Sequence, residues 1–165
     1  MKVYLTGISG TGKSSIVREL VSKGINAIDI DELSHWENKH TGLRTGWEPG
    51  SSEEWHDSHV WVCDVERLKE CLAKHKDLVV AGFASNYLDF LNLFDKSVLL
   101  EGSPETILVR IDSRLDNDFG KHPAERKRIL DSQKDLEEGM LKGGAFTLNV
   151  ERPLEEVVAD FLEYL

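Results

Sequence analysis

Short apolar runs and longer stretches of helical spacing alternate along this chain from its first residues to its last. The apolar runs predict five strands, at residues 2–6, 26–30, 77–82, 96–100 and 145–150. Helical spacing predicts helices over residues 14–23, 87–94, 103–114, 123–142 and from 153 onward. Strands that alternate with helices indicate an α/β domain, in which helices cover both faces of a parallel sheet.

The segment between the second and third predicted strands has a less regular pattern. We expect a short helix over residues 31–39, then a glycine-containing loop, then one long helix over residues 52–75. Three side chains of the long helix have a spacing that could bind zinc: His56, His59 and Cys63. Such a set is more often a packed or solvated helix face, so we favour that interpretation.

This irregular segment carries two tryptophans and an arginine. A long loop inside a compact domain usually has a function. Trp36 and Trp47 are suited to stacking on a ring, and Arg44 is suited to holding an anion. Core packing is an equally common use of a tryptophan, so both interpretations stay open. We expect the chain, residues 1–165, to form a single domain in which about residues 31–62 bind a ligand, the region called acceptor-binding below.

Composition and charge narrow the range of partners. The chain has 20 lysines and arginines against 30 aspartates and glutamates, and this net charge of −10 argues against a nucleic-acid partner. No apolar run approaches transmembrane length, and a strand that begins at residue 2 leaves no room for a signal peptide. Cys63 and Cys71 suggest no disulfide framework. We therefore expect a cytoplasmic protein without a membrane partner, either a monomer or a homodimer.

The strongest chemical signal is the run Gly7-Ile8-Ser9-Gly10-Thr11-Gly12-Lys13-Ser14, directly behind the first predicted strand. It matches the phosphate-binding pattern G-x-x-x-x-G-K-[ST] in its usual place, between a strand and a helix. Glycines let successive N–H groups turn toward phosphate oxygens, and a helix start favours anions. Lys13 is expected at the β- and γ-phosphates and Ser14 on Mg²⁺. The residues expected to bind the phosphates of ATP are Ser9, Gly10, Thr11, Gly12, Lys13, Ser14 and Ser15.

A carboxylate is also expected near the metal, and it has to come from an unusual position. Many phosphate-loop proteins hold Mg²⁺ with an aspartate at the end of the third strand, but here that strand ends at Gly82. Asp29, at the carboxyl end of the second strand, is the nearest candidate by topology. Asp31 follows two residues later. It points to the opposite side of an extended chain unless the strand stops between the two aspartates.

Two further cations belong to the predicted helix that begins near residue 103. Arg110 and Arg114 are four residues apart, hence on one helix face and able to converge on one anion. A polar break follows at about residues 115–124, and the next helix carries Arg126 and Arg128. Solvated helices with surface arginines would give the same pattern. Beside a phosphate loop, however, arginines around a mobile segment are typical of a lid.

Taken together, these residues resemble the small P-loop kinases of the adenylate kinase and shikimate kinase group over nearly the whole chain. The resemblance implies the three-layer α/β/α fold with strand order 2-3-1-4-5 and a short lid. Asp29 and Asp31 look like the shikimate-kinase motif, in which the first carboxylate holds Mg²⁺ through water and the second contacts the acceptor hydroxyl. A glycine-containing segment occupies the position of Gly82 in that subgroup.

The arginines resemble the adenylate-kinase arrangement, which implies that Arg110 stacks on adenine and that Arg114 reaches the phosphates. It also implies that Arg152 and Pro153 border the adenine. The substrate-binding arginines of shikimate kinases are not evident, and Arg44 is a partial candidate for one of them.

The sequence therefore predicts a Mg²⁺- and ATP-dependent kinase that acts on a small metabolite, nucleoside or nucleotide. Lys13, Asp31 and Arg114 are the expected catalytic residues, and Ser14 and Asp29 the expected metal ligands. The residues expected to contact the acceptor are Asp31, Trp36, Arg44 and Gly82. A non-catalytic nucleotide-binding switch or adaptor and a simple NTPase remain as alternatives.

Overall fold

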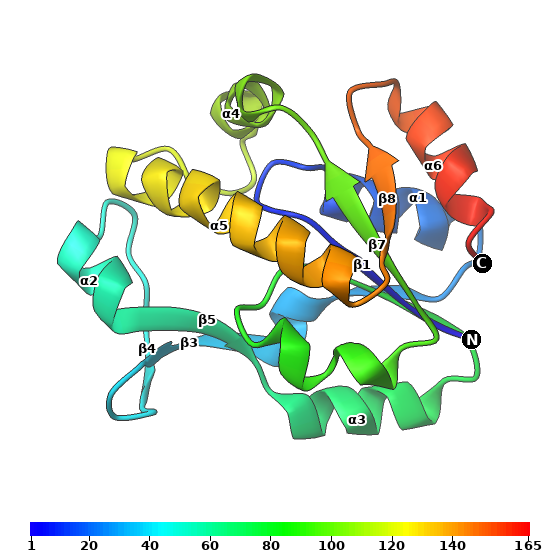
Figure 1. Cartoon of the computed structure of the whole chain (residues 1–165), viewed down its shortest axis with the longest axis horizontal. Coiled ribbons are helices and arrows are strands. Elements are labelled where there is room, and N and C mark those ends of the chain that lie inside the picture. Colours follow the sequence, from blue (N-terminus) through cyan, green and yellow to red (C-terminus); the bar gives the residue numbers. More distant parts are fainter.

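A five-stranded parallel sheet runs through the computed structural model, which describes residues 1–165 (Figure 1). Its strands are β1 (Lys2–Thr6), β2 (Ala27–Asp29), β6 (Leu78–Ala81), β7 (Lys96–Glu101) and β8 (Phe146–Asn149). They pair in the order β2-β6-β1-β7-β8, with every pair parallel. Counted along the chain within this sheet, the order is 2-3-1-4-5, so the expected topology is confirmed.

Alternating side chains of the strands divide the core into two layers. Val3 and Leu5 of β1 pack against the helices α1 (Lys13–Ser22) and α6 (Leu154–Leu162). Tyr4 of β1 belongs to the opposite layer, with the helices α3 (Val65–Lys74), α4 (Pro104–Ser113) and α5 (Pro123–Lys142). Figure 1 shows α5 lying across one face of the sheet, and α1 and α6 together beside β8. The three-layer arrangement is therefore confirmed.

The segment between β2 and β6 differs from the expectation. It forms an antiparallel sheet in the order β4-β3-β5, built from β3 (Ser34–Asn38), β4 (Arg44–Thr45) and β5 (His59–Cys63). The expected helix over residues 31–39 is wrong, because the short 3₁₀ helix η1 (Ile30–Leu33) is followed directly by β3. We call residues 34–63 the antiparallel arm.

The expected long helix over residues 52–75 is also wrong. This segment instead contains the helix α2 (Glu53–Ser58), the strand β5 and the helix α3, which begins after Asp64. Residues 59–63 pair along their whole length with β3, and Trp36 lies opposite Trp61. Cross-strand pairs of aromatic and β-branched side chains stabilise such a sheet and outweigh local helical spacing.

The segment after β6 does not form the expected helix over residues 87–94. Two short 3₁₀ helices replace it, η2 (Tyr87–Asp89) and η3 (Leu91–Leu93). The side chain of Asn86 holds the start of this segment on β5, because it accepts from the Cys63 N–H at 2.9 Å and donates to the Cys63 carbonyl at 3.0 Å. Phe90 and Phe94 then pack their rings against Tyr4.

None of the helices combines the length and the apolar character needed to span a bilayer.

Candidate active site

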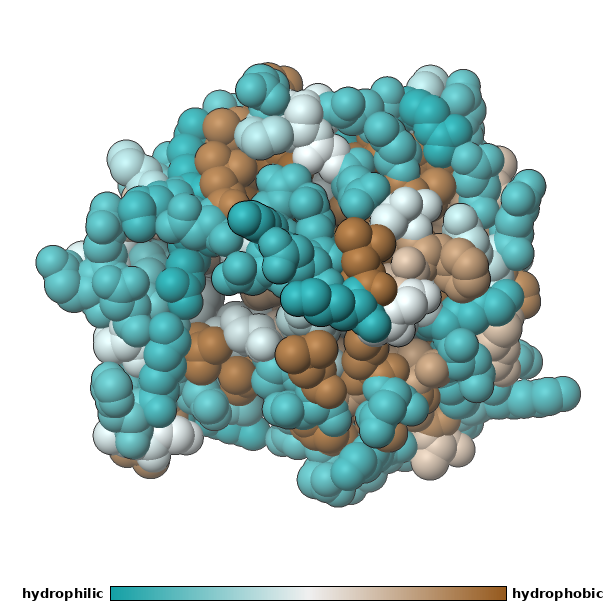
Figure 2. All heavy atoms as spheres, viewed as in Figure 1, coloured by the Kyte–Doolittle hydropathy of each residue, from teal (hydrophilic) through white to brown (hydrophobic).

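A cleft of about 1000 Å³ opens at the carboxyl end of the parallel sheet. Its walls come from the loop between β1 and α1, from η1, from the antiparallel arm, from the loop between α4 and α5, and from α5 and the start of α6. Figure 2 shows this side of the molecule hollowed between the antiparallel arm and the main body. The cleft is therefore shared by the phosphate loop and the region in which the chain departs from the expected helices.

The phosphate loop has the predicted strand–loop–helix context. β1 ends at Thr6, and α1 begins at Lys13 with Gly12 before it at φ +95°. Gly10 has φ +91°, and a Cβ atom there would lie 3.0 Å from the Ile107 carbonyl oxygen. Residues that carry a Cβ atom rarely adopt this backbone conformation, so the shape of the loop requires glycine at these positions.

The Lys13 ammonium lies across the mouth of this loop. Its Nζ atom donates to the carbonyl oxygens of Gly7 and Ile8, both at 2.8 Å. Burial lowers the pKa of Lys13 to about 8, while the charges of Asp31 and Asp29 act in the opposite direction. A cation held here by weak carbonyl acceptors is well placed to bind a phosphate chain instead.

Ser14 and Asp29 lie side by side at the start of α1 and the end of β2. The Ser14 hydroxyl donates to Oδ2 of Asp29 at 3.2 Å. The other carboxylate oxygen of Asp29 accepts from the Asp31 N–H at 3.1 Å. β2 stops at Asp29 and η1 begins at Ile30, so the extended chain ends between the two aspartates and both line the cleft.

Asp31 faces the cleft from η1. Burial in the cleft, together with the neighbouring charge of Asp29, raises the pKa of Asp31 to about 6, although Lys13 and a polar contact with Trp61 act in the opposite direction. A carboxylate with a pKa near neutrality is able to accept a proton late in a reaction.

Gly82 sits beneath this pair of aspartates and is buried, outside the lining of the cleft. A Cβ atom at Gly82 would lie 2.2 Å from Cγ2 of Ile30 and 3.4 Å from Oδ1 of Asp29. The Tyr4 hydroxyl donates to the Gly82 carbonyl at 3.0 Å and fixes its position from below. Gly82 therefore lets η1 pack closely onto the end of β6, and we assign it a positioning role in place of contact with the acceptor.

Arg114 connects the phosphate loop to the segment that follows α4. Its Nη1 donates to the Ser9 hydroxyl at 3.1 Å, and its Nε donates to the Asn117 carbonyl at 3.1 Å. Its Nη2 also donates to the carbonyl of Phe119. The same guanidinium thus lies beside the phosphate loop and orders the loop at residues 114–122, which corresponds to the expected lid.

Arg110 and Arg152 line the other end of the cleft. Nη2 of Arg110 donates to the Val150 carbonyl at 2.6 Å, and Nη2 of Arg152 is 2.6 Å from Oδ2 of Asp160. The expectation that Arg110 and Arg114 share one helix face is wrong, because α4 ends at Ser113 and the backbone of Arg114 is extended, so the two arginines contact different groups. Pro153 flanks Arg152 without lining the cleft.

The remaining residues of the expected ATP site belong to the phosphate loop and the start of α1. They all border the cleft: Ser9, Gly10, Thr11, Gly12 and Ser15. The buried Thr11 hydroxyl donates to the Ile8 carbonyl at 2.9 Å, which stabilises the loop from inside.

Trp36 and Trp47 both line the cleft, on the side formed by the antiparallel arm. The Trp36 ring centroid lies 5.1 Å from that of Trp55 and 5.5 Å from that of Trp61. Trp36 therefore packs on other tryptophans and also faces the cleft, and Trp47 faces the cleft beside Phe119. Arg44 does neither, because its exposed side chain pairs with Asp64 at 3.2 Å outside the cleft.

Sequence reasoning missed Glu125, a fully buried carboxylate at the start of α5. It accepts from the N–H groups of Gly120 at 2.8 Å, His122 at 3.4 Å and Gly50 at 3.1 Å. It therefore joins the loop after α4 to the antiparallel arm. A glutamate three positions after a helix cap, behind Pro123, is a known N-terminal signal and could have identified it.

The fold and this site define a P-loop protein of the small-kinase group, similar to the shikimate kinases. The chain belongs to the AAA domain family, whose sequence model matches residues 3–131.

Individual relatives agree with this placement. The chain is 29% identical to a shikimate kinase of Salinibacter ruber, over 99% of this chain and 83% of that protein. It is also 29% identical over 91 residues to a UPF0200 protein of Thermococcus onnurineus, a match that spans about half of both chains, 52% of this one and 49% of the other. The crystal structure of a shikimate kinase from Aquifex aeolicus superimposes with a TM-score of 0.57 at 25% identity, covering 99% of this chain and 95% of that chain.

Proposed function

We propose that this protein is an ATP-dependent kinase that transfers the γ-phosphoryl group to a hydroxyl of a small acceptor. The observation that carries this proposal is the meeting of Lys13, Ser14, Asp29, Asp31 and Arg114 around one cleft. Phosphoryl transfer passes through a loose transition state, so the protein mainly positions the reactants and neutralises charge. The similarity to shikimate kinases in sequence and fold supports the same conclusion.

The residues present fit a bound magnesium ion. The Ser14 hydroxyl and the Asp29 carboxylate are hard oxygen donors 3.2 Å apart, and Mg²⁺ prefers such ligands. We assign both residues to the metal, which when bound neutralises charge on the β- and γ-phosphates.

In the proposed transfer, the acceptor hydroxyl oxygen forms a bond to the γ-phosphorus. The bond between that phosphorus and the β–γ bridging oxygen breaks, and ADP leaves with the bonding electrons. The hydroxyl proton passes to Asp31, whose raised pKa of about 6 suits a late proton acceptor. Lys13 and Arg114 stabilise the charge on the migrating group from the phosphate loop and from the lid.

Release of ADP tests the proposal directly. The protein is supplied with ATP and Mg²⁺, with and without nucleosides, nucleoside monophosphates, sugars or aminoglycosides. We expect release that depends on an acceptor. Release that no acceptor changes would identify a simple NTPase, and nucleotide binding without any release would identify a switch or adaptor.

A further inference from the structure

The acceptor side of the cleft has an aromatic wall formed by Trp36, Trp47, Trp61, Tyr87 and Phe119. Trp36 and Trp61 are cross-strand neighbours in the antiparallel arm, and the ring centroids of Trp47 and Phe119 lie 5.6 Å apart. Aromatic faces attract cations through the ring quadrupole and also pack against flat apolar groups. The wall therefore favours a ligand with a flat or apolar body, and it favours such a ligand most when the ligand also carries a positive charge.

The charged side chains around this wall are mostly acidic. Asp31, Asp131 and Asp135 line this half of the cleft. Asp131 pairs with Lys127 at 3.1 Å, and Glu138 on the same helix pairs with Lys134 and Lys142, which leaves Asp135 without an ion-pair partner. Asp135 also lies close enough to the buried Tyr87 side chain to add to the effect of burial, which raises the pKa of that tyrosine.

The cations that border this half of the cleft already have partners, since Arg114 donates to the Phe119 carbonyl and to the Ser9 hydroxyl. Arg128 is the arginine that α5 contributes to the cleft wall, and its Nη1 lies 4.0 Å from Oδ1 of Asp57. Arg44, the expected anion ligand of the arm, pairs with Asp64 away from the cleft. A phosphate or carboxylate placed against the aromatic wall would meet the unpaired carboxylate of Asp135, and the nearby guanidinium groups are engaged by other partners.

We infer that the acceptor is a hydroxyl-bearing organic amine with a flat or apolar body. Its ammonium group binds between the aromatic wall and Asp135, and its hydroxyl group reaches Asp31 at the mouth of the phosphate loop. This inference rests on the proposed kinase function and names the chemical class of its second substrate.

Three matched probes test the inference by calorimetric titration of the whole protein without ATP. They share a benzyl alcohol body and differ in charge: 4-(aminomethyl)benzyl alcohol, 4-methylbenzyl alcohol and 4-(hydroxymethyl)benzoate. We expect the amine to bind about tenfold more tightly than the neutral probe, and the carboxylate to bind most weakly. Equal binding of all three, binding of none, or preference for the carboxylate would overturn the inference.

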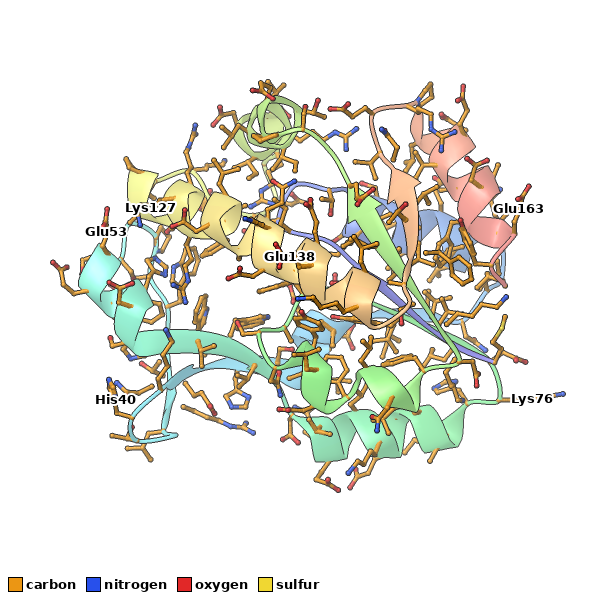
Figure 3. The ribbon with its side chains drawn as sticks, in the orientation of Figure 1. His40, Glu53, Lys76, Lys127, Glu138 and Glu163 are labelled. Atoms are coloured by element: carbon orange, nitrogen blue, oxygen red, sulfur yellow. The ribbon has the colours of Figure 1, made fainter.

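Two variants of α5 locate the effect. Asp135→Asn should lower the affinity for the amine to that for the neutral probe, while binding of the neutral probe stays unchanged. Glu138→Gln is the matched control, because Glu138 lies on the same helix outside the cleft (Figure 3) and should change none of the affinities. An amine preference that survives Asp135→Asn would contradict the inference.

This test is separable from the test of the kinase itself, because binding is measured without turnover. ADP release that the carboxylate probe stimulates and the amine probe does not would support the kinase and overturn the acceptor class. Selective binding of the amine without any ADP release would support the acceptor class and count against the kinase.

Discussion

The half of the cleft proposed to bind nucleotide (the nucleotide half) and the half proposed to bind the acceptor (the acceptor half) are built in different ways. The nucleotide half is a contiguous strand, loop and helix, in which Lys13 and Ser14 follow directly from β1. The acceptor half is assembled from distant segments, because β3 pairs with β5 and Glu125 reaches back to Gly50. The ligand proposed for the first half is a triphosphate, which a local motif suffices to bind. The proposed second substrate would be bound by long-range contacts, which can differ between proteins of one fold.

Removing the cation of the nucleotide half should have the largest effect. Lys13→Ala is expected to lower the rate of acceptor-dependent ADP release by about a thousand-fold, because the charge at the phosphate chain is lost. The fold should persist, since Nζ of Lys13 donates mainly to carbonyl groups of its own loop. Circular dichroism checks the fold, and Lys76→Ala, which removes an exposed lysine far from the cleft (Figure 3), is the control. Unchanged turnover in Lys13→Ala would eliminate the kinase scheme.

The junction between the two halves should be the next most sensitive position. Gly82→Ala places a methyl group 2.2 Å from Cγ2 of Ile30, and φ at this position is +148°. We expect the free energy of unfolding to fall by about 3 kcal/mol, measured by urea denaturation. Gly24→Ala is the control, because Gly24 has φ +78° but no atom within 4 Å of the added Cβ. It should cost about 1 kcal/mol from backbone strain alone. Equal losses in both variants would mean that contact with Ile30 is unimportant.

Glu125→Gln tests how firmly the acceptor half is tied to the lid. The amide replaces one acceptor oxygen by a donor that faces the N–H groups of Gly120 and Gly50. We expect a loss of about 2 kcal/mol in the free energy of unfolding, together with faster proteolytic cleavage between residues 114 and 122. Glu138→Gln, at an exposed position of the same helix, should show neither change. Slow cleavage in Glu125→Gln would show that other contacts hold the lid.

The smallest expected effect is the pH dependence due to Asp31. Its pKa of about 6 in the folded protein lies above the ordinary pKa of an aspartate, so the ionised form destabilises the folded state. This destabilisation is absent below pH 4, develops between pH 4 and 6, and is complete above pH 6. Solvent in the cleft screens the charge, so we expect about 1 kcal/mol.

Asp31→Asn should therefore be more stable than the wild-type protein at pH 7.5 but not at pH 4. Denaturation of the metal-free protein at both pH values measures the difference. A constant difference between the two proteins across this range would contradict the assigned pKa.

The same contrast explains what could be predicted from the sequence. The parallel sheet, the phosphate loop and α5 follow from local patterns, since apolar runs and a glycine-rich motif need no distant partner. Residues 59–63 have spacing that is compatible with a helix, and pairing with Ser34–Asn38, which local pattern does not reveal, makes them a strand. Arg44 looked like an anion ligand because its pairing with Asp64 depends on the position of β4 beside β3.

The relation of Asp29 to Asp31 could be stated only as a condition, namely that the strand ends between them. The structure meets this condition because Ile30 begins η1, and buried Gly82 leaves room for that turn. Glu125 was missed for a related reason. Its position at a helix start is visible in the sequence, but the loop from the arm that it binds is not.

The antiparallel arm has a consequence for how such proteins diversify. It is one uninterrupted insertion that leaves the body after η1 and returns at α3, and the body's five strands pair without it. We therefore expect that residues 34–63 can be exchanged as one segment, which would change the second substrate of the proposed kinase and leave its phosphate loop intact. The tryptophan-rich antiparallel arm of this protein is one variant of that segment.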